Sequence, residues 1–347
     1  MKVALVRGGY LNNFEGQNYT NPGKAIKITA ISSLSPVHKN FKFPIIKLPS
    51  LYDVAFPTWL ANRTFGDRQI LFGLESAVKE FNIIHTADPH YYYSYQLAKL
   101  RKENKLKRLI STSWETIPFN NESTQAKKKI KKFAMKYVDR FICHSERAKK
   151  CLIKEGVNSK KISVIRLGID LTRFSRKVHK VYKVRKVQKV RVLFVGRDVP
   201  EKGLKDLRGS IKHLIEPNSV ELLVAGNIPY EKMPEVYALA DIFVMPSKTT
   251  KTWEEQYGMV LIEAMASGLP ILAYRSGAIP ELLGSAGILV PEGNLTKLSK
   301  ELEKLVASSQ MRKKLGKLAR KRAEKLFDSK KFGLEVGKLY KQVYFSV

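Results

Sequence analysis

Short apolar runs alternate with amphipathic stretches along most of this chain. In the first half, we expect buried strands at Val3–Val6, Phe43–Lys47, Asn82–His85, Arg108–Thr112, Arg140–Cys143 and Ser163–Arg166. In the second half, we expect them at Val190–Val195, Glu221–Ala225, Ile242–Met245, Pro270–Ala273 and Gly287–Val290. Helical patterns lie between them, for example at Phe72–Glu80, Tyr92–Glu103, Thr124–Tyr137 and Glu146–Glu155. Strands that alternate with helices favour parallel sheets, so the pattern predicts an α/β fold.

The length of 347 residues is enough for two domains of ordinary size. A stretch in which cations and valines alternate irregularly, residues 175–190, predicts a basic linker between them. We therefore expect two doubly wound, Rossmann-like domains, at residues 1–174 and 191–329. Ligands of such sheets bind at the carboxyl ends of strands, and here we expect them in a central cleft between the domains.

The segment Trp253–Pro270 reads W-E-E-Q-Y-G-M-V-L-I-E-A-M-A-S-G-L-P. Residues 259–266 are apolar on almost every side, which predicts a buried helix that begins after Gly258 and ends at Gly268. Glu263 lies inside this helix, and a buried carboxylate is costly unless a partner satisfies it. An ion pair with a basic residue of a neighbouring helix and a ligand-binding role both remain open for Glu263.

Three further elements lie where a strand meets a loop. The turn G-R-D-V-P-E-K-G-L, Gly196 to Leu204, follows a strand and places Arg197 and Lys202 where both could reach one phosphate group. A solvated turn with two surface cations fits this loop equally well. Ser247 follows the strand ending at Met245, and residues 278–283, A-I-P-E-L-L, read as another entry into a helix.

Basic residues outnumber acidic ones by 63 to 31, which gives a formal net charge of +32. This excess favours an anionic partner such as nucleic acid, a membrane face or a phosphorylated substrate. The only two cysteines, Cys143 and Cys151, fit core thiols in a reducing compartment. With no apolar run long enough for a signal peptide or a membrane span, we expect a cytoplasmic protein.

In order and spacing, these four elements resemble the nucleotide-binding domain of glycosyltransferase family four, the retaining group 1 glycosyl transferases of GT-B fold. The resemblance spans residues 190–290 and includes the complete E-x7-E element formed by Glu255 and Glu263. It extends into the first domain at residues 144–157 and 161–170, where Leu167-Gly168-Ile169-Asp170 replaces the family's Pro-Gly-(Ile/Val)-Asp wording. Residues 330–347 resemble the terminal helix that returns to the N-terminal domain in this fold.

The resemblance implies a retaining glycosyltransferase that uses a nucleotide-sugar, with either UDP or GDP as the nucleotide. It implies that Glu263 binds the ribose hydroxyls and Glu255 the donor sugar, while Arg197 and Lys202 neutralise the leaving phosphate. Further donor contacts fall on Ser247, Gly258, Met259 and Val260, the last two through their amides at a helix start. Since the chain has no D-x-D pair, we expect no metal and no other cofactor.

In the first domain, the glycine-bearing loop after the first strand implies backbone contacts to the donor or acceptor at Gly8 and Gly9, although a Gly-Gly turn is common. The place where many members carry a histidine near the reacting sugar here reads S-T-S-W-E-T-I-P-F. We expect acceptor-side roles for Trp114 and Glu115, with simple packing as the alternative for Trp114. His85 and His90 flank a D-P pair and are expected to be structural.

One departure concerns the donor. Between Gly203 and Tyr237 the family normally has two strands, whereas this chain has only Val220–Asn227, so one βα unit is missing. The identity of the nucleotide base in the donor therefore stays open. The acceptor is expected to be lipid-linked, a glycan or phosphorylated.

The helix candidate at residues 124–137 contains six lysines: Lys127, Lys128, Lys129, Lys131, Lys132 and Lys136. Its apolar positions, Ile130, Phe133, Ala134 and Tyr137, share one face, so a core-packed helix with solvated lysines is one interpretation. Peripheral attachment to an anionic membrane face is the other. A non-catalytic GT-B-like protein that binds anionic lipid or nucleic acid, and a nucleotide-sugar epimerase, are the alternative functions. No helix-turn-helix or aromatic RNA-binding motif supports nucleic acid specifically.

Overall fold

The computed structural model describes residues 1–175, 189–215 and 219–346. By its internal contacts the chain divides into unit 1, residues 1–167 with 329–347, and unit 2, residues 168–328. The expected basic linker at 175–190 lies almost entirely outside the described residues. No helix among the described residues is both long enough and apolar enough to cross a membrane.

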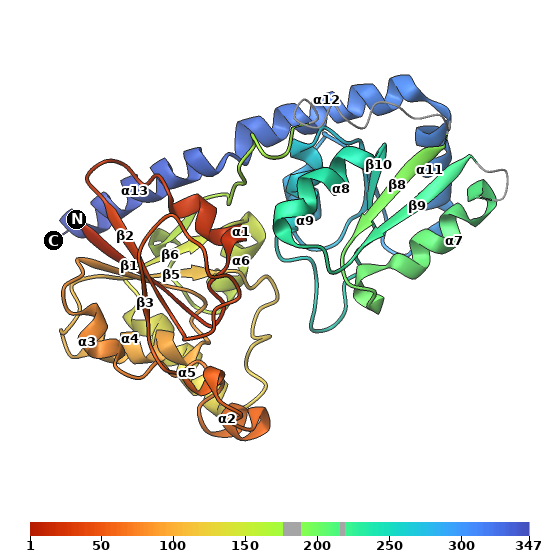
Figure 1. The fold of residues 1–347 in the computed structure, drawn as a ribbon. Helices are drawn as coiled ribbons and strands as arrows, with labels where there is room; N and C mark the ends of the chain where they lie inside the picture. The colour runs from red at the N-terminus through yellow and green to blue at the C-terminus, as the bar shows by residue number, and fades with distance from the viewer. Residues whose placement is uncertain (176–188, 216–218, 347) are drawn as a thin grey trace. The chain divides into compact units, whose positions relative to one another are not determined.

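Unit 1 is built on a seven-stranded parallel sheet in the order β3-β2-β1-β4-β5-β6-β7 (Figure 1). Its strands are β1 (Lys2–Gly8), β2 (Lys27–Ser32), β3 (Ile45–Lys47), β4 (Ile83–Thr86), β5 (Leu109–Ser113), β6 (Arg140–Cys143) and β7 (Ile162–Val164). Its helices are α1 (Asn13–Gly16), α2 (Thr58–Thr64), α3 (Leu74–Val78), α4 (Tyr92–Lys102), α5 (Gln125–Tyr137), α6 (Glu146–Lys154) and α13 (Ser329–Phe345), with 3₁₀ turns η1 (Gln17–Tyr19), η2 (Leu51–Asp53) and η3 (Ser159–Lys161).

The central strands of unit 1, β1, β4, β5 and β6, are buried on both faces, as expected of a parallel sheet between layers of helices. Helices α4 and α5 pack on a core that includes Ala4, Val6 and Leu97. The helix α13 packs against η1, and its Tyr340 hydroxyl lies 2.6 Å from Nδ1 of His85 on β4. Both cysteines are buried free thiols in this unit.

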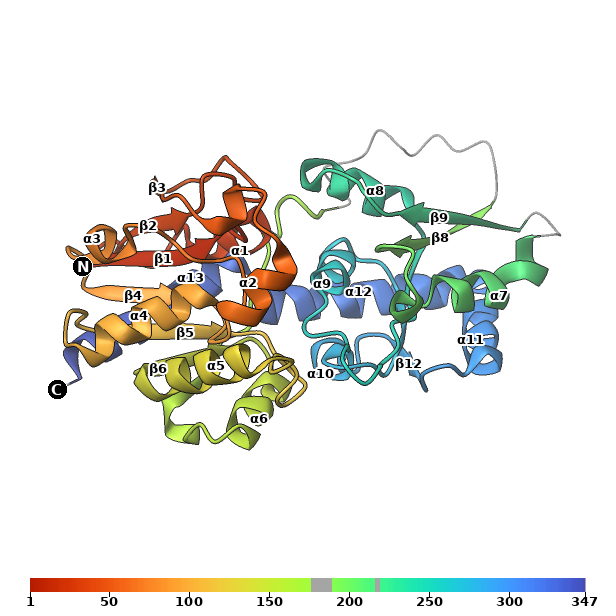
Figure 2. The ribbon, with the colours of Figure 1, turned by 90° about the horizontal axis from the view of Figure 1, so that it is seen from below.

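Unit 2 has a five-stranded parallel sheet in the order β12-β11-β10-β8-β9 (Figure 2). Its strands are β8 (Val190–Val195), β9 (Val220–Ala225), β10 (Ile242–Met245), β11 (Ile271–Tyr274) and β12 (Ile288–Val290). Its helices are α7 (Leu204–Ile215), α8 (Met233–Leu239), α9 (Met259–Ala266), α10 (Ile279–Leu283), α11 (Leu295–Ala307) and α12 (Ser309–Leu326), with 3₁₀ turns η5 (Pro200–Lys202) and η6 (Tyr230–Lys232). Helices α7 and α11 pack on a core with the sheet, whereas α9 packs against α12 and β11.

The predicted α/β fold with two Rossmann-like units is confirmed. The described residues hold a single strand, β9, between Gly203 and Tyr237, as the pattern of apolar runs indicated. The strand β2 was not predicted. Its apolar residues, Ile28, Ala30 and Ile31, are few and interspersed with polar ones, and pairing with β1 compensates for this weak local signal.

Residues 168–174 belong to unit 2, whereas the sequence placed them at the end of the first domain. Ile169 forms a bridge with Asp328, and the Phe174 ring lies against Tyr230 and Tyr237. The guanidinium of Arg173 stacks 4.5 Å above the Tyr230 ring. These contacts bind the segment to unit 2.

Candidate functional site

The sheet of unit 2 reverses its winding between β8 and β10, because β8 pairs with β9 on one side and with β10 on the other. In doubly wound sheets, ligands bind at the carboxyl edge beside such a switch point. Here the loop after β8 contains Arg197 and Lys202, and the loop after β10 contains Ser247 and Glu255. The topology thus brings these four residues to one edge.

Close backbone contact ties the two loops together. Gly203 has φ +70°, and a Cβ there would lie 1.9 Å from the Pro246 carbonyl oxygen. The amide of Lys248 also donates to the Glu201 carbonyl oxygen at 2.8 Å. Gly203 is therefore required for both its left-handed conformation and the space beside Pro246.

The tied loops place a cation beside a carboxylate. Lys202 Nζ lies 2.8 Å from Glu255 Oε2 and 4.6 Å from the centroid of the Trp253 ring. The Ser247 hydroxyl donates to the same Glu255 oxygen at 3.3 Å. The two charged side chains stay 19% and 10% exposed, so the pair is reachable from solvent.

Glu255 is held from behind by the loop that precedes α10. The Ala278 amide donates to the Glu255 carbonyl oxygen at 2.8 Å. Gly277 has φ +50°, and a Cβ there would lie 2.1 Å from that same oxygen. The A-I-P-E-L-L element therefore positions the Glu255 backbone.

The helix α9 begins at this edge, as predicted. Its N-cap, Gly258, has φ +81° and supplies no side chain to the helix start. Amides at the first turn of a helix have no partner within the helix, and the helix dipole adds partial positive charge there. The Met259 and Val260 amides at this start therefore suit an anion.

Glu263, inside α9, is buried with only 2% of its surface exposed. Its Oε2 accepts a hydrogen bond from the Tyr237 hydroxyl at 2.8 Å, and no ion pair to it is found among the described residues. Burial raises the pKa of Glu263 to about 7, although the Tyr237 hydrogen bond and the charge of Arg173 act in the opposite direction. The ion pair considered from sequence is therefore replaced by a neutral hydroxyl partner.

Arg197 differs from Lys202, although both lie in the same turn. Its side chain is exposed, and within the described parts of the chain nothing is seen to bind it. Its neighbour Asp198 pairs with Arg208 at 3.2 Å instead. Arg197 is therefore available to an incoming anion.

In unit 1, Gly8 and Gly9 end β1 in a crowded environment. A Cβ on Gly8 (φ +53°) would lie 2.4 Å from Gln69 Oε1, and one on Gly9 would lie 2.6 Å from the Tyr52 ring. The Gly9 amide donates to Gln69 Oε1 at 2.9 Å. A ligand that used this amide would have to displace Gln69.

The predicted acceptor-side residues are engaged in local contacts. One oxygen of Glu115 accepts the amides of Thr116 and Ile117 at 2.9 and 3.0 Å, and the other accepts the side-chain amides of Asn120 and Asn121. Glu115 therefore shapes its own turn. Trp114 is half-buried, with its ring centroid 4.4 Å from that of His144.

His85 is structural, as expected. Its two ring nitrogens lie within hydrogen-bond distance of the hydroxyls of Tyr340 and Thr112. Burial, followed by the nearby charge of Arg7, lowers its pKa well below the ordinary value.

Sequence reasoning missed three supporting residues of the unit 2 site: Tyr237, Trp253 and Gly277. Tyr237 lies 26 positions before Glu263, so only the fold shows that its hydroxyl reaches the carboxyl group. Trp253 begins the motif, but only the structure shows that its ring lies beside the Lys202 ammonium group. Gly277 directly precedes the A-I-P-E-L-L element, where a glycine before a helix start is a usable signal.

Two family models match the chain. The one described as Glycosyl transferases group 1 matches residues 216–322, and the one described as Glycosyltransferase Family 4 matches residues 40–173. A sulfoquinovosyl transferase of Arabidopsis thaliana is 31% identical over 157 residues, which cover 39% of this chain and 30% of that protein. The matched stretches span less than half of the length of the curated relatives.

Solved structures with the same fold match nearly the whole chain. A sucrose-phosphate synthase from Thermosynechococcus elongatus superposes with a TM-score of 0.74 at 17% identity, covering 99% of both chains. The Anabaena protein HepE, solved with UDP-glucose, superposes with a TM-score of 0.70 at 16% identity, covering 99% of this chain and 100% of the other. At these identities the likeness establishes the two-domain GT-B fold.

Proposed function

Because the chain belongs to the group 1 glycosyltransferases of family 4, we propose that it transfers a sugar from a nucleotide-sugar to an acceptor. The observation that carries this proposal is the convergence of Lys202, Ser247 and Glu255 at the sheet's switch point, beside the open start of α9. A cation, a carboxylate and free amides are the groups needed to bind a sugar diphosphate.

In the proposed complex, the diphosphate lies between the α9 start and the side chains of Arg197 and Lys202. It competes with Glu255 for the Lys202 ammonium group, and this exchange releases the Glu255 carboxylate to accept hydroxyls of the donor sugar. Glu263 binds the ribose hydroxyls in its buried position.

In the reaction, the bond between the anomeric carbon and the phosphate oxygen breaks, and a bond to an acceptor oxygen forms on the same face of the sugar. The acceptor's proton leaves with the nucleoside diphosphate. The negative charge that develops on the leaving phosphate is neutralised by Arg197, Lys202 and the helix dipole, which is the electrostatic contribution expected to dominate catalysis. We propose that no metal takes part, since these cations perform that task.

The test combines the purified protein with a panel of UDP- and GDP-sugars, with and without glycan and lipid-linked acceptors, in the presence of a chelator. Release of nucleoside diphosphate that depends on an acceptor, with an anomeric proton signal of retained configuration, supports the proposal. Conversion of the donor into an epimer without release would establish the epimerase alternative. No turnover of any donor, together with binding to anionic lipid, would favour a non-catalytic role.

We further propose that unit 1 attaches to an anionic membrane face, which would bring a lipid-linked acceptor within reach. Four lysines of α5 are exposed: Lys128, Lys129, Lys132 and Lys136. On the adjacent α2, the Trp59 side chain is 68% exposed, and tryptophan is favoured at membrane interfaces. The α5 lysines supply about 1 kcal/mol each at an anionic surface.

The structure corrects one member of this lysine set and confirms the apolar face. Lys131 is buried, with its ammonium group paired to Glu155 and 3.7 Å from Glu122, so it takes no part in a membrane surface. Ile130 and Ala134 are buried, while Phe133 and Tyr137 pack partly against the core.

Vesicle sedimentation tests the attachment. We expect binding to anionic but not to neutral vesicles at low salt, and reduced binding when Lys128, Lys129 and Lys132 are changed to glutamine. Equal binding to both vesicle types would refute it and leave the proposed transfer reaction untouched.

A further inference from the structure

A second cavity of unit 2, of about 660 Å³, lies at the opposite edge of the sheet from the proposed donor site. One wall contains Asp241 and Pro270, which directly precede β10 and β11, together with residues 266–268 at the end of α9. Ser247 and Glu255, in contrast, follow β10. Because all strands run parallel, the cavity lies at the amino edge and is distinct from the donor site.

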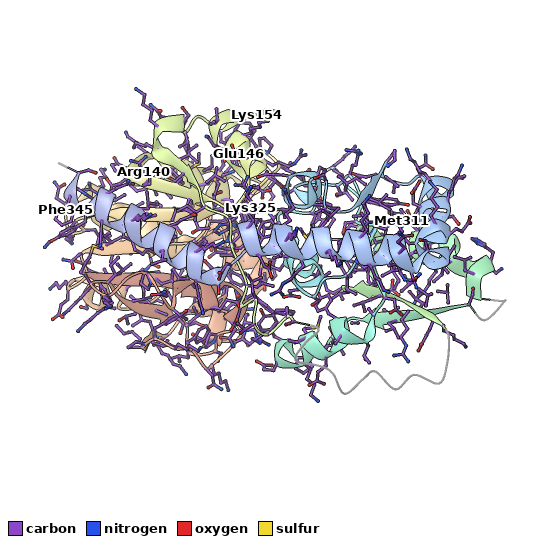
Figure 3. All side chains as sticks on the ribbon, turned by 90° about the horizontal axis from the view of Figure 1, so that it is seen from above. Arg140, Glu146, Lys154, Met311, Lys325 and Phe345 are labelled. Atoms are coloured by element: carbon purple, nitrogen blue, oxygen red, sulfur yellow. The ribbon has the colours of Figure 1, made fainter. Side chains whose placement is uncertain are left out.

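The other wall is a single stripe along α12. Its successive residues lie alternately three and one positions apart, so equivalent positions recur every four residues on one face of the helix: Ser309, Arg312, Lys313, Gly316, Lys317, Arg320, Lys321 and Glu324. With a rise of 1.5 Å per residue, the stripe is about 22 Å long. Figure 3 shows the length of α12 between the labelled Met311 and Lys325.

The length of the lining stripe suits an extended occupant. The groove is shallow at Gly316, where a Cβ would lie 2.3 Å from the Gly268 carbonyl oxygen. Here α12 and the turn after α9 touch through their backbones and form the floor.

The two arginines of the stripe are held in place. Arg320 donates to the carbonyl oxygens of Phe174 and Ala266, so it closes the end of α9. Arg312 donates to the Leu305 and Val306 carbonyl oxygens at 2.7 Å. Carbonyl partners do not neutralise a guanidinium, so the charge of Arg312 remains beside the groove, whereas Glu324 balances the charge of Arg320 at 2.7 Å.

The lysines of the stripe are free to bind. Lys313, Lys317 and Lys321 are exposed, and across the described ranges no side-chain partner of theirs is seen. They follow one another at about 6 Å along the helix axis. The acidic residues that line the groove are Asp241 and Glu324, against the basic residues Arg312, Lys313, Lys317, Arg320 and Lys321, so the groove has an excess of positive charge.

Among the described residues, no aromatic side chain lines the groove, so it offers no platform for stacking bases.

We propose that this groove binds an extended, non-aromatic polyanion, a chain whose carboxylate or phosphate groups lie along Lys313, Lys317 and Lys321. Arg312 supplies fixed charge at its base. The site is separate from the proposed donor site and does not depend on turnover of a nucleotide-sugar.

Binding is measured by calorimetry at about 0.15 M salt. The probes are an oligogalacturonate that spans the groove, a linear polyphosphate of similar length and an oligothymidylate of similar charge. The first two separate carboxylate from phosphate preference. We expect both to bind more tightly than the oligothymidylate.

The variant with Lys313, Lys317 and Lys321 changed to glutamine should lose at least about tenfold in affinity for these probes. The matched control changes Lys300, Lys314 and Lys325, three exposed lysines outside the groove, and should lose less than about threefold despite the same change in charge. Circular dichroism confirms that each variant is folded.

Equal losses in the two triple variants would overturn the proposal, because net charge alone would then explain binding. Tighter binding of the oligothymidylate would also overturn it, in favour of nucleic acid, as would the absence of binding by every probe. Donor hydrolysis should be retained by the groove variant, so failure here is distinguishable from failure of the proposed transfer reaction.

Discussion

Both units carry a parallel sheet with an ion pair near the end of its first strand, but the two sheets use these charged groups differently. In unit 1, Arg7 is buried at the end of β1, with its guanidinium 2.6 Å from a Glu15 oxygen and 3.0 Å from the His85 carbonyl oxygen. In unit 2, the Lys202–Glu255 pair stays partly exposed, and Arg197 reaches into solvent.

The comparison distinguishes charged groups that stabilise the local structure from charged groups that can change partners. A fully buried ion pair has lost its hydration and depends on its fixed partners, so it resists exchange. A partly exposed pair exchanges at low cost, because water replaces whichever partner leaves. The edge of unit 2 is therefore suited to binding an anion, whereas the corresponding groups of unit 1 fix the framework.

The largest expected effect comes from breaking the buried Arg7–Glu15 pair of unit 1. Glu15→Ala leaves the Arg7 guanidinium buried and uncompensated, and we expect a loss of about 3–5 kcal/mol in the free energy of unfolding, measured by urea denaturation. The matched control is Glu80→Ala, which removes the exposed pair between Lys2 and Glu80 and should cost less than about 1 kcal/mol. Similar losses in the two variants would show that burial does not distinguish them.

The next largest effect comes from breaking the partly exposed Lys202–Glu255 pair of unit 2. Lys202→Ala removes the cation that neutralises the leaving phosphate, and we expect turnover of the nucleotide-sugar to fall by about 10²–10³-fold. The unfolding free energy should fall by about 1–3 kcal/mol, less than for Glu15→Ala, because the mostly buried Glu255 loses its cation but keeps the Ser247 hydroxyl. Lys205→Ala, at an exposed position three residues later, is the control and should keep full activity. A Lys202→Ala enzyme of normal activity would remove Lys202 from the mechanism.

Glu255→Gln complements this test from the other side of the pair. We expect a fall in turnover of similar size, about 10²-fold or more, because the neutral amide binds the donor's hydroxyls without the charge of a carboxylate. Donor binding should be affected less than turnover, which steady-state kinetics separates. A normal turnover rate would contradict the role that we propose for Glu255.

The features that could be predicted from the sequence were those whose interacting residues are neighbours in the chain. The helix α9, its glycine start and the burial of Glu263 were predictable because composition and turn residues within Trp253–Pro270 specify them locally. The gathering of Lys202, Ser247 and Glu255 followed from the rule that parallel strands share a carboxyl edge.

Features that depend on distant partners were not predictable. Lys131 lies within a run of lysines that reads as solvated, and only its pairing with Glu155, 24 positions later, accounts for its burial. Similarly, Tyr237 replaces the basic partner expected for Glu263. The strand β2 is stabilised by β1, and its own residues give a weak signal.

A smaller effect concerns Glu263 of unit 2. This residue is buried like the Arg7–Glu15 pair of unit 1, but we propose that it binds the donor. Since its pKa is raised from 4.5 to about 7, the folded protein retains this proton to higher pH than the unfolded chain does. Stability from this group is therefore full below about pH 4.5 and falls as the pH rises, by about 3 kcal/mol in total.

Glu263→Gln should remove this part of the decline. Relative to the parent protein, the variant should gain about 3 kcal/mol between pH 4 and pH 8, measured by urea denaturation at a series of pH values. Asp67 and Asp88, whose pKa values burial also raises to about 7, decline equally in both proteins. The same variant should bind the donor nucleotide more weakly if Glu263 binds the ribose. Parallel stability curves for the two proteins would contradict the raised pKa.

The smallest expected effect comes from two glycines that lie six residues apart. Together they report how closely the loops after β8 and β10 are packed. A Cβ on Gly209, on the exposed side of α7, would meet nothing within 4 Å, so Gly209→Ala should stabilise the protein by about 0.5–1 kcal/mol through helix propensity. Gly203→Ala introduces the same methyl group but directs it at the Pro246 carbonyl oxygen, so it should instead lower both the unfolding temperature and turnover. If Gly203→Ala matched Gly209→Ala in both measurements, the two loops would not be held in contact, and the position of Lys202 beside Glu255 would need another cause.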